Sequence, residues 1–310
     1  MKKILVVGSL NVDMVVNVDH TPAVGETILT DRLALVPGGK GANQACAAGR
    51  LGANVKMLGA VGEDSYADIQ IKSLGDAGVD ISCIVKKENE TTGLAFITVN
   101  AEGDNSIVVV SGANAVFSPQ DIERNIKLIK ESDIVILQLE IPLDTVLYAA
   151  KMAKLFGKIV ILDPAPVPKE FPMELYQYVD IIKPNETELS MLTGMPCTMD
   201  SVSEGARKLR DYGVKEVLVT LGEKGVFINS AVCGECMIPA YKVETVDTTA
   251  AGDSFTAALA IMLSEKKNII EAAEFANLVS SIVVTRKGAQ SSIPTLQEVM
   301  EYQRTREMTV

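Results

Sequence analysis

The chain has 310 residues, of which 47% are hydrophobic and 5% aromatic, and it carries a net charge of −11. This composition is sufficient for a large aliphatic core, in one large α/β unit or in two domains. The acidic balance excludes a general nucleic-acid-binding protein, because such proteins need a cationic surface to displace counterions.

The first residues combine a basic start with a short apolar run at residues 4–7. Gly8 and polar residues interrupt this run, so we expect a buried strand and no signal peptide. No apolar run along the chain reaches the length of a membrane span. We therefore expect a cytoplasmic protein without a membrane partner.

Strands and helices then alternate through the first 110 residues. The patterns predict strands at 14–18, 25–36 and 55–61, and helices at 42–51 and 64–77. Two further apolar segments, 93–99 and 106–110, flank a turn at 100–104 and predict a β-hairpin.

The residues after position 110 show the alternation of strands and helices that is typical of an α/β protein. Strands are predicted at 134–139, 159–162, 179–182 and 217–220, and helices at 118–131, 143–156 and 201–212. This alternation predicts right-handed βαβ units and a mostly parallel central sheet flanked by helices. Antiparallel strands at 226–229 and 237–246 and helices at 251–264, 269–285 and 296–304 complete the chain.

These elements predict one α/β body and one small projecting β-sheet. The body comprises residues 1–12, 38–90 and 112–310, and the projecting sheet comprises residues 13–37 and 91–111. A few strands that project from an α/β body are suited to cover a ligand, so we interpret this sheet as a lid.

The strongest local signal is the segment 247–255, Asp-Thr-Thr-Ala-Ala-Gly-Asp-Ser-Phe, which follows a predicted strand and opens a long helix. Its small residues at 250–252 leave backbone N–H groups accessible at the helix N-terminus, where the dipole favours an anion. Phosphoryl transfer needs such a site. Asp253 is placed to accept the proton of an attacking hydroxyl, although a simple helix cap is an equally good interpretation of this segment alone.

A second signal is the segment 38–45, Gly-Gly-Lys-Gly-Ala-Asn-Gln-Ala. Its glycines permit close backbone approach to a ligand, and Asn43 offers donors and acceptors for sugar hydroxyls. Taken alone, it fits a glycine-rich turn that caps a small-residue helix better than a ligand site. It lacks the spacing of the common phosphate loop, and Gly8 opens no dinucleotide fingerprint, so an NAD-dependent oxidoreductase is disfavoured.

Polar residues also follow other predicted strands, where the binding crevice of an α/β sheet lies. Asn11 and Asp13 follow the first strand, and Asp13 can accept hydrogen bonds from two neighbouring sugar hydroxyls; Glu140 follows the run 134–139. Asn185 and Glu188 share one helix face, and such oxygen ligands suit Mg²⁺. The alternatives are a solvated turn and a helix cap with surface acids.

Together these segments resemble the ribokinase-like carbohydrate kinase family, and the resemblance extends over essentially the whole chain, to residues 285–290. It implies ATP-dependent phosphorylation of D-ribose at the 5-hydroxyl, giving ribose 5-phosphate and ADP. Asp253 would be the catalytic base, with an anion hole at Ala250, Ala251 and Gly252. The sugar would be held by Asn11, Asp13, Gly39, Lys40, Gly41, Asn43, Glu140 and Asp253. ATP would contact Asn185, Thr220, Gly222, Gly225, Gly252 and Asn277.

The resemblance also implies Mg²⁺, with Glu188 in its network, and a monovalent cation, K⁺. The cation positions would be Asp247, Thr249, Val283, Arg286, Gly288 and Ser292. A homodimer formed through the lid is expected as well, because a sheet with open edges and an apolar face tends to be covered.

Two other functions stay open. One is a kinase of the same family that acts on another acceptor: fructose, a sugar phosphate, a nucleoside or deoxyribose. The other is a non-catalytic sugar-binding protein on the same fold, which the retention of Gly252 and Asp253 together with Asn185 and Glu188 disfavours.

Overall fold

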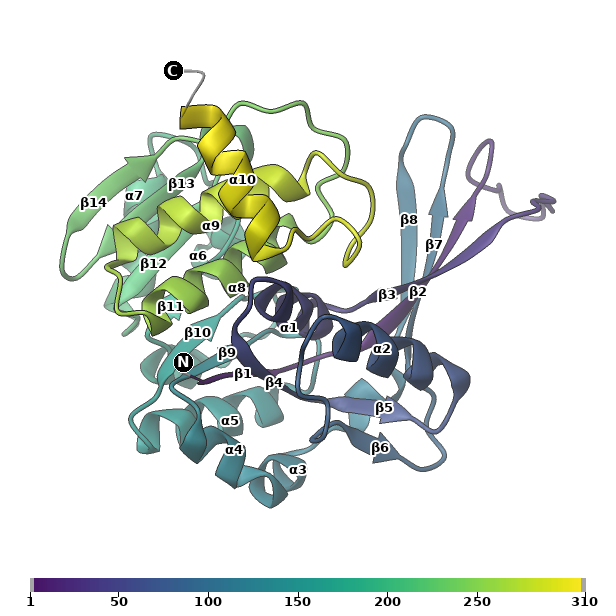
Figure 1. Cartoon of the computed structure of the whole chain (residues 1–310), viewed down its shortest axis with the longest axis horizontal. Coiled ribbons are helices and arrows are strands. Elements are labelled where there is room, and N and C mark those ends of the chain that lie inside the picture. The colour runs from purple at the N-terminus through teal and green to yellow at the C-terminus, as the bar shows by residue number, and fades with distance from the viewer. Residues whose placement is uncertain (1–2, 308–310) are drawn as a thin grey trace.

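An eight-stranded sheet forms the centre of the computed structural model, which describes residues 3–307 (Figure 1). Its strand order is β14-β13-β12-β11-β10-β9-β1-β4. The strands from β4 to β12 are parallel, and β13 and β14 add an antiparallel edge. The mostly parallel sheet is thereby confirmed. Its strands are β1 (Lys3–Val7), β4 (Asn54–Leu58), β9 (Ile134–Leu137), β10 (Ile159–Leu162), β11 (Ile181–Ile182), β12 (Glu216–Thr220), β13 (Val226–Ser230) and β14 (Gly234–Ile238).

Helices cover both faces of this sheet, and alternate residues of β1 show why. Ile4 and Val6 belong to one buried core and Leu5 and Val7 to the other, as the two-residue period of a strand requires. The first core lies under α1 (Lys40–Arg50), α2 (Ser65–Asp76), α8 (Ala251–Ser264), α9 (Ile269–Val283) and α10 (Leu296–Glu307). The second lies under α3 (Pro119–Arg124), α4 (Ile126–Glu131), α5 (Leu143–Leu155), α6 (Glu186–Thr193) and α7 (Val202–Asp211).

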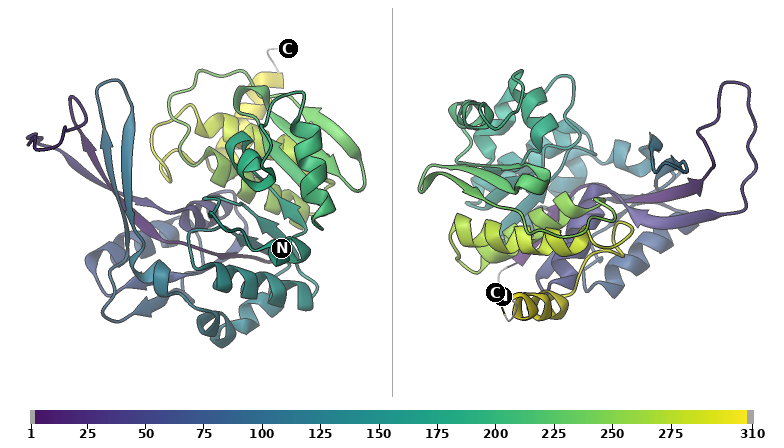
Figure 2. Two further views of the ribbon diagram at one scale, coloured as in Figure 1. Left: turned by 180° about the vertical axis from the view of Figure 1, so that it is seen from behind. Right: turned by 90° about the horizontal axis from the view of Figure 1, so that it is seen from above.

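A separate four-stranded sheet projects from the body, as Figures 1 and 2 show from three directions. Its order is β3-β2-β7-β8, from β2 (Asn11–Asn17), β3 (Leu33–Gly38), β7 (Gly93–Val99) and β8 (Asn105–Val110). At its base Asn11 pairs with both Gly38 and Gly93. We call these four strands the lid; its division from the body at the predicted boundaries stays a prediction.

Smaller elements complete the description. Strands β5 (Ala60–Gly62) and β6 (Val85–Lys87) form a parallel pair. The predicted strand at 55–61 merged β5 with β4, and no strand was predicted at 85–87. Three short 3-10 helices lie at Gly112–Val116, Met173–Tyr178 and Gly222–Lys224. Within residues 3–307, we find no helix with the length and apolar character needed to cross a lipid bilayer.

Three predicted elements were wrong in extent. The strand at 25–36 is only Leu33–Gly38, because β2 pairs with this segment only from Leu33 onward. The strand at 237–246 ends at Ile238, because Pro239 cannot donate to the ladder. The helix at 118–131 is two helices, which meet at a non-helical Asn125.

Candidate active site

Polar side chains gather where the parallel strands end. Asn11 lies beyond β1, Glu140 beyond β9, Asp163 directly after β10 and Lys183 directly after β11, while Thr220 closes β12. The carboxyl ends of parallel strands meet at one edge of a sheet, where α/β proteins bind ligands. The N-termini of α1 and α8 reach the same edge, since side chains of α1 contact Asp253.

Asp253 is the third residue of α8, and its carboxylate is buried, with 6% of the residue exposed. Oδ2 accepts a hydrogen bond from Asn43 Nδ2 and Oδ1 one from Gln44 Nε2, both at 3.0 Å. The residue at the cap position is Ala250, so the interpretation of Asp253 as a helix cap is wrong. Burial raises the pKa of Asp253, whereas the nearby Lys40 ammonium lowers it.

The backbone before Asp253 is arranged as an anion site. Ala250 adopts a left-handed conformation, with φ 61° and ψ 7°, which is rare for a residue with a side chain and turns the chain into α8. Within residues 3–307, the N–H groups of Gly252 and Asp253 donate to no backbone carbonyl. They point along the dipole of a 14-residue helix, so the turn at 250–253 can bind phosphate oxygens.

A cavity of about 890 Å³ opens beside this turn. The loop that replaces the predicted strand contributes Ala240–Val243 to its wall. Gly225 needs its glycine, because φ is +101° and an added Cβ would lie 2.0 Å from the Ile238 carbonyl oxygen. All six residues expected to contact ATP line this one cavity: Asn185, Thr220, Gly222, Gly225, Gly252 and Asn277.

The residues expected to hold the sugar lie on the other side of Asp253, around the base of the lid. Glu140 Oε2 accepts hydrogen bonds from the Ser9 hydroxyl at 2.6 Å and from the Lys40 N–H at 2.9 Å. Gly39, with φ +86°, lies so close to Asn11 that an added Cβ would be 2.8 Å from the Asn11 nitrogen. A Cβ on Gly41 would meet the backbone of Ser9 in the same way. The structure therefore brings together these segments from three parts of the chain.

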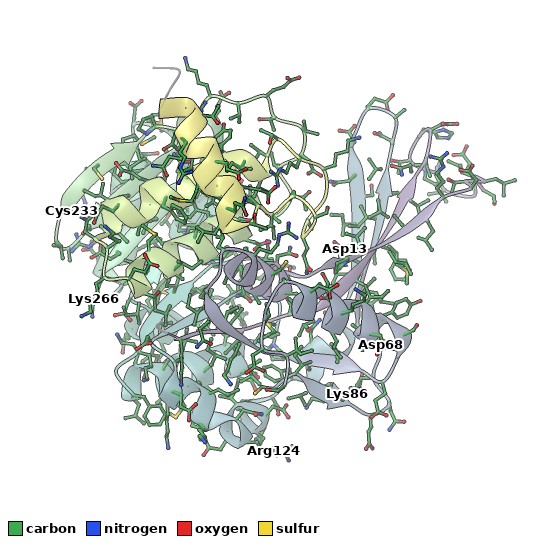
Figure 3. The ribbon with its side chains drawn as sticks, in the orientation of Figure 1. Asp13, Asp68, Lys86, Arg124, Cys233 and Lys266 are labelled. Carbon is green, nitrogen blue, oxygen red and sulfur yellow. The ribbon has the colours of Figure 1, made fainter. Side chains whose placement is uncertain are left out.

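Asn43 and Asp13 add acceptors to this region. Asn43 Oδ1 is buried and has no hydrogen-bond partner within the described residues. The carboxylate of Asp13 lies against Gly38 at the base of the lid (Figure 3). Burial, together with the charge of Glu140, raises the pKa of Asp13 to about 6. Unpaired acceptors of this kind suit the hydroxyl groups of a sugar.

Lys40 supplies one positive charge of the site. Burial would lower the pKa of its ammonium group, but the surrounding carboxylates outweigh this effect and raise it, so Lys40 stays protonated. Those carboxylates belong to Asp253, Asp163, Glu140 and Glu188.

The positions expected to hold a monovalent cation come from the loop before α8 and from the end of α9 with the loop that follows it. Asp247 accepts hydrogen bonds from Thr249 through Oδ1 and from the Gly288 N–H, at 2.9 Å, through Oδ2. The side chain of Arg286 is directed to Glu298 at 2.9 Å, which leaves only its backbone for a ligand role. Val283 and Ser292 lie in the same segment, and both are buried.

Asn185 and Glu188 form a reciprocal cap at the start of α6. Glu188 N–H donates to Asn185 Oδ1, and Asn185 N–H donates to Glu188 Oε2, both at 2.8 Å. The helix-cap interpretation is therefore correct for this pair. Asn185 nevertheless also lines the nucleotide-sized cavity, and burial raises the pKa of Glu188.

Three buried polar residues next to Asp253 were not predicted from the sequence: Gln44, Asp163 and Lys183. Gln44 lies inside the glycine-rich segment that was singled out for Asn43. Asp163 and Lys183 each follow a predicted strand directly, which is the same signal that identified Glu140. Applying that rule to every strand would have found both.

Comparison with known proteins agrees with this geometry. The model of the pfkB family carbohydrate kinases matches residues 1–296. The chain is 41% identical to the ribokinase of Haemophilus influenzae, with 97% of this chain and 98% of the relative covered, and 39% identical to the deoxyribokinase of Salmonella typhi, with 96% and 98% covered. The solved structure of Arabidopsis thaliana ribokinase complexed with ribose and ATP matches with a TM-score of 0.92 and 37% identity, covering 97% of this chain and 98% of that one. The chain therefore belongs to the pfkB family of carbohydrate kinases.

Proposed function

We propose that this kinase transfers the γ-phosphoryl group of ATP to the 5-hydroxyl of D-ribose. One observation carries the proposal: Asp253 joins the two halves of the site. Its own helix turn, through Ala251 and Gly252, lines the nucleotide-sized cavity, while its carboxylate accepts a hydrogen bond from Asn43 in the sugar segment. A base at this junction can reach an acceptor hydroxyl held against the terminal phosphate.

The residues of the chain suggest the following step. Asp253 accepts the proton of the ribose 5-hydroxyl as that oxygen forms a bond to the γ-phosphorus. The bond between the γ-phosphorus and the bridging oxygen breaks, and ADP leaves. The free N–H groups of Gly252 and Asp253 stabilise the charge on the transferring oxygens.

Ribose is the acceptor that the relatives and the pocket chemistry favour together. Asp13 and the unpartnered Asn43 Oδ1 offer acceptors for neighbouring hydroxyls, and Lys40 and Glu140 flank them. The structural relative from Arabidopsis thaliana binds ribose and ATP. The deoxyribokinase relative makes deoxyribose the second candidate acceptor.

Two cations belong to the proposal. Mg²⁺ bound with ATP neutralises phosphate charge, and Glu188 would act in its network through water, because both of its carboxylate oxygens already accept hydrogen bonds from Asn185. K⁺ would be held by Asp247 and by backbone oxygens of Thr249, Val283, Arg286, Gly288 and Ser292. A carboxylate beside loop carbonyls is a donor set suited to a weakly hydrated cation.

The lid would close over the sugar and form the interface of a homodimer. By covering the sugar it would exclude water and limit ATP hydrolysis. Its exposed apolar side chains suit a homodimer interface, since a sheet with an uncovered apolar face tends to be covered. These side chains include Leu33, Leu35, Phe96, Ile107, Val108 and Val109.

The direct test of the acceptor atom compares ribose with 5-deoxyribose. Ribose should give ADP and a sugar whose phosphate is coupled to the C5 protons in the NMR spectrum. 5-Deoxyribose, which lacks the acceptor oxygen, should bind competitively without stimulating ADP release. Phosphorylation at another carbon, or turnover of 5-deoxyribose, would overturn the assignment of the 5-hydroxyl.

A further inference from the structure

A chain of buried polar side chains connects Asp253 to the ends of β10 and β11. The Gln44 amide nitrogen donates to Asp253 Oδ1 and to Asp163 Oδ2, each at 3.0 Å. Lys183 Nζ lies 3.1 Å from Asp163 Oδ2 and 3.3 Å from the carbonyl oxygen of Gly252. The exposed fractions of Gln44, Asp163 and Lys183 are 0%, 2% and 4%, so water does not screen these contacts. This series of contacts therefore begins at Asp253 and ends at Gly252, both in the first turn of α8.

The partners of Gln44 determine the orientation of its amide. Gln138 Nε2 donates to Gln44 Oε1 at 2.5 Å, so the oxygen side faces a donor. Both N–H groups face carboxylates. A flipped Gln44 amide would direct its oxygen at the carboxylate oxygens of Asp253 and Asp163. Its nitrogen would then face the Gln138 amide nitrogen, so each of these contacts would be repulsive. Gln44 therefore donates to Asp253 in one orientation only.

We propose that Gln44 is a positioning residue for Asp253, and that the buried pair of Asp163 and Lys183 holds Gln44 in place. This inference rests on the proposed role of Asp253 as the base. With Oδ1 engaged by Gln44 and Oδ2 by Asn43, the plane of the carboxylate is fixed, and its remaining lone pairs are left for the acceptor hydroxyl. A buried ion pair contributes little net stability, so a positioning role accounts for its location better than a stabilising one.

The charges around Asp253 extend the same inference. Lys40 faces it from α1, Asp163 from the end of β10 and Lys183 from the end of β11, while Glu140 and Glu188 face Lys40. Asp163 raises the pKa of Asp253 and Lys183 lowers it. Removal of Lys183 would leave an uncompensated carboxylate beside the base, and removal of both charges would restore the balance.

The first test is Gln44→Met, which keeps the side-chain length and removes both donors. The loss of a hydrogen bond to a charged group should lower kcat by about 10- to 100-fold. The KM values for sugar and ATP should change little, and the acid limb of the pH profile of kcat should move to higher pH. The control is Ser132→Ala, which removes a buried hydrogen bond to Ile129 before the start of β9, at the sheet edge opposite the site, and should leave kcat and the profile unchanged. A Gln44→Met enzyme with wild-type kcat and profile would overturn the inference, provided that Asp253→Asn is inactive.

A second pair of variants decides the question if circular dichroism shows that Gln44→Met is unfolded. Lys183→Met should move the acid limb to higher pH, and Asp163→Asn combined with Lys183→Met should return it toward the wild-type position. An unmoved acid limb in Lys183→Met would contradict the inference. An active Asp253→Asn enzyme would instead overturn the proposed base, and with it the role of Gln44, so the two failures are distinguishable.

Discussion

The side-chain amide of Asn43 donates to Asp253 Oδ2 across 3.0 Å, although 210 positions separate the two residues in the chain. Asn43 lies in the first turn of α1, within the glycine-rich segment 38–45, and Asp253 lies in the first turn of α8. Each segment had a plain structural interpretation when taken alone. Their contact turns two ambiguous motifs into one site, with sugar-binding groups on one side of a carboxylate and an anion-binding helix turn on the other.

Asp253→Asn should lower turnover by roughly 10²- to 10⁴-fold, because a general base contributes a factor of this size. Ribose binding should persist, since Asn keeps the shape of the side chain. ADP release measures turnover and calorimetry measures binding. Asp68→Asn is the matched control: Asp68 is an exposed acid in the first turn of α2, and its loss should leave turnover unchanged (Figure 3). Turnover of Asp253→Asn within about threefold of wild type would exclude the role.

Ribose affinity should depend on the protonation of Asp13. Burial raises the pKa of Asp13 to about 6, so its carboxylate loses acceptor capacity as the pH falls through that value. Below it the dissociation constant should rise by about tenfold per pH unit, as linkage requires. Calorimetry of ribose binding from pH 5 to 8 should show this rise in the wild type and a flat response in Asp13→Asn.

The raised pKa of Asp13 also makes the free energy of unfolding depend on pH. Between the ordinary aspartate pKa of 3.8 and the raised pKa of about 6, the folded chain holds the Asp13 proton more tightly than the unfolded chain. The contribution of Asp13 to the free energy of unfolding therefore falls as the pH rises through this range. Ligand-free Asp13→Asn should melt at a higher temperature than the wild type at pH 7. A lower melting temperature would contradict the assigned direction.

Gly252→Ala should weaken catalysis without unfolding the protein. An added Cβ at this position meets only Lys183 Nζ, at 3.1 Å, so the fold can accommodate it. The methyl group would nevertheless occupy space beside the anion-binding N–H groups, and kcat/KM for ATP should fall by roughly 10²-fold. Gly75→Ala, in α2, is the matched control because its Cβ would have only an ordinary contact with Ile81 at 3.8 Å. Equal kinetics for the two variants would argue against an anion hole at this turn.

Asp247→Asn should abolish activation by K⁺. The Asp247 carboxylate is the charged ligand of the proposed cation site, and hydrogen bonds from Thr249 and Gly288 lower its pKa despite burial. Wild-type turnover should fall when tetramethylammonium replaces K⁺. In the variant, the ratio of the two rates should approach one. A variant with undiminished K⁺ activation would place the cation elsewhere.

Val108→Asp should convert a dimer into a monomer. Val108 is 65% exposed on β8, and a buried charge at an apolar interface is costly. Light scattering at micromolar concentration should give twice the chain mass for the wild type and the single chain mass for the variant. A monomeric wild type would contradict dimerisation through the lid.

The architecture was largely predictable from sequence, because buried parallel strands produce apolar runs such as those of β9 and β10. The errors arose where apolar residues lack a partner. Leu29 lies in an alternating pattern but is 93% exposed, since no strand pairs with that segment. Val246 lies in a segment whose residues favour a strand, but Pro239 ends the hydrogen-bonded pairing of β14 before that segment.

The site was predictable in its motifs and less so in its connections. Among the residues expected at the nucleotide, Asn185, Thr220 and Gly252 line the cavity because each ends a strand or opens a helix at the same sheet edge. Gly225 and Asn277 reach the same cavity from a turn before β13 and from the middle of α9. The hydrogen bond between Gln44 and Asp163 joins a helix to the end of a strand 119 positions away. A local sequence pattern does not predict a contact over that separation. Lys183 follows a strand directly, as Glu140 does, but a lysine is usually exposed, whereas the structure buries this one beside Asp163.

The most direct test of the central claim is a coupled ADP-release assay with MgATP and K⁺, with ribose, deoxyribose, fructose, fructose 6-phosphate and adenosine offered in parallel. We predict selective turnover of ribose. Preferential turnover of another acceptor would contradict the assigned sugar while keeping the kinase chemistry. No turnover of any acceptor, with ribose binding still detectable by calorimetry, would contradict the proposed phosphoryl transfer itself.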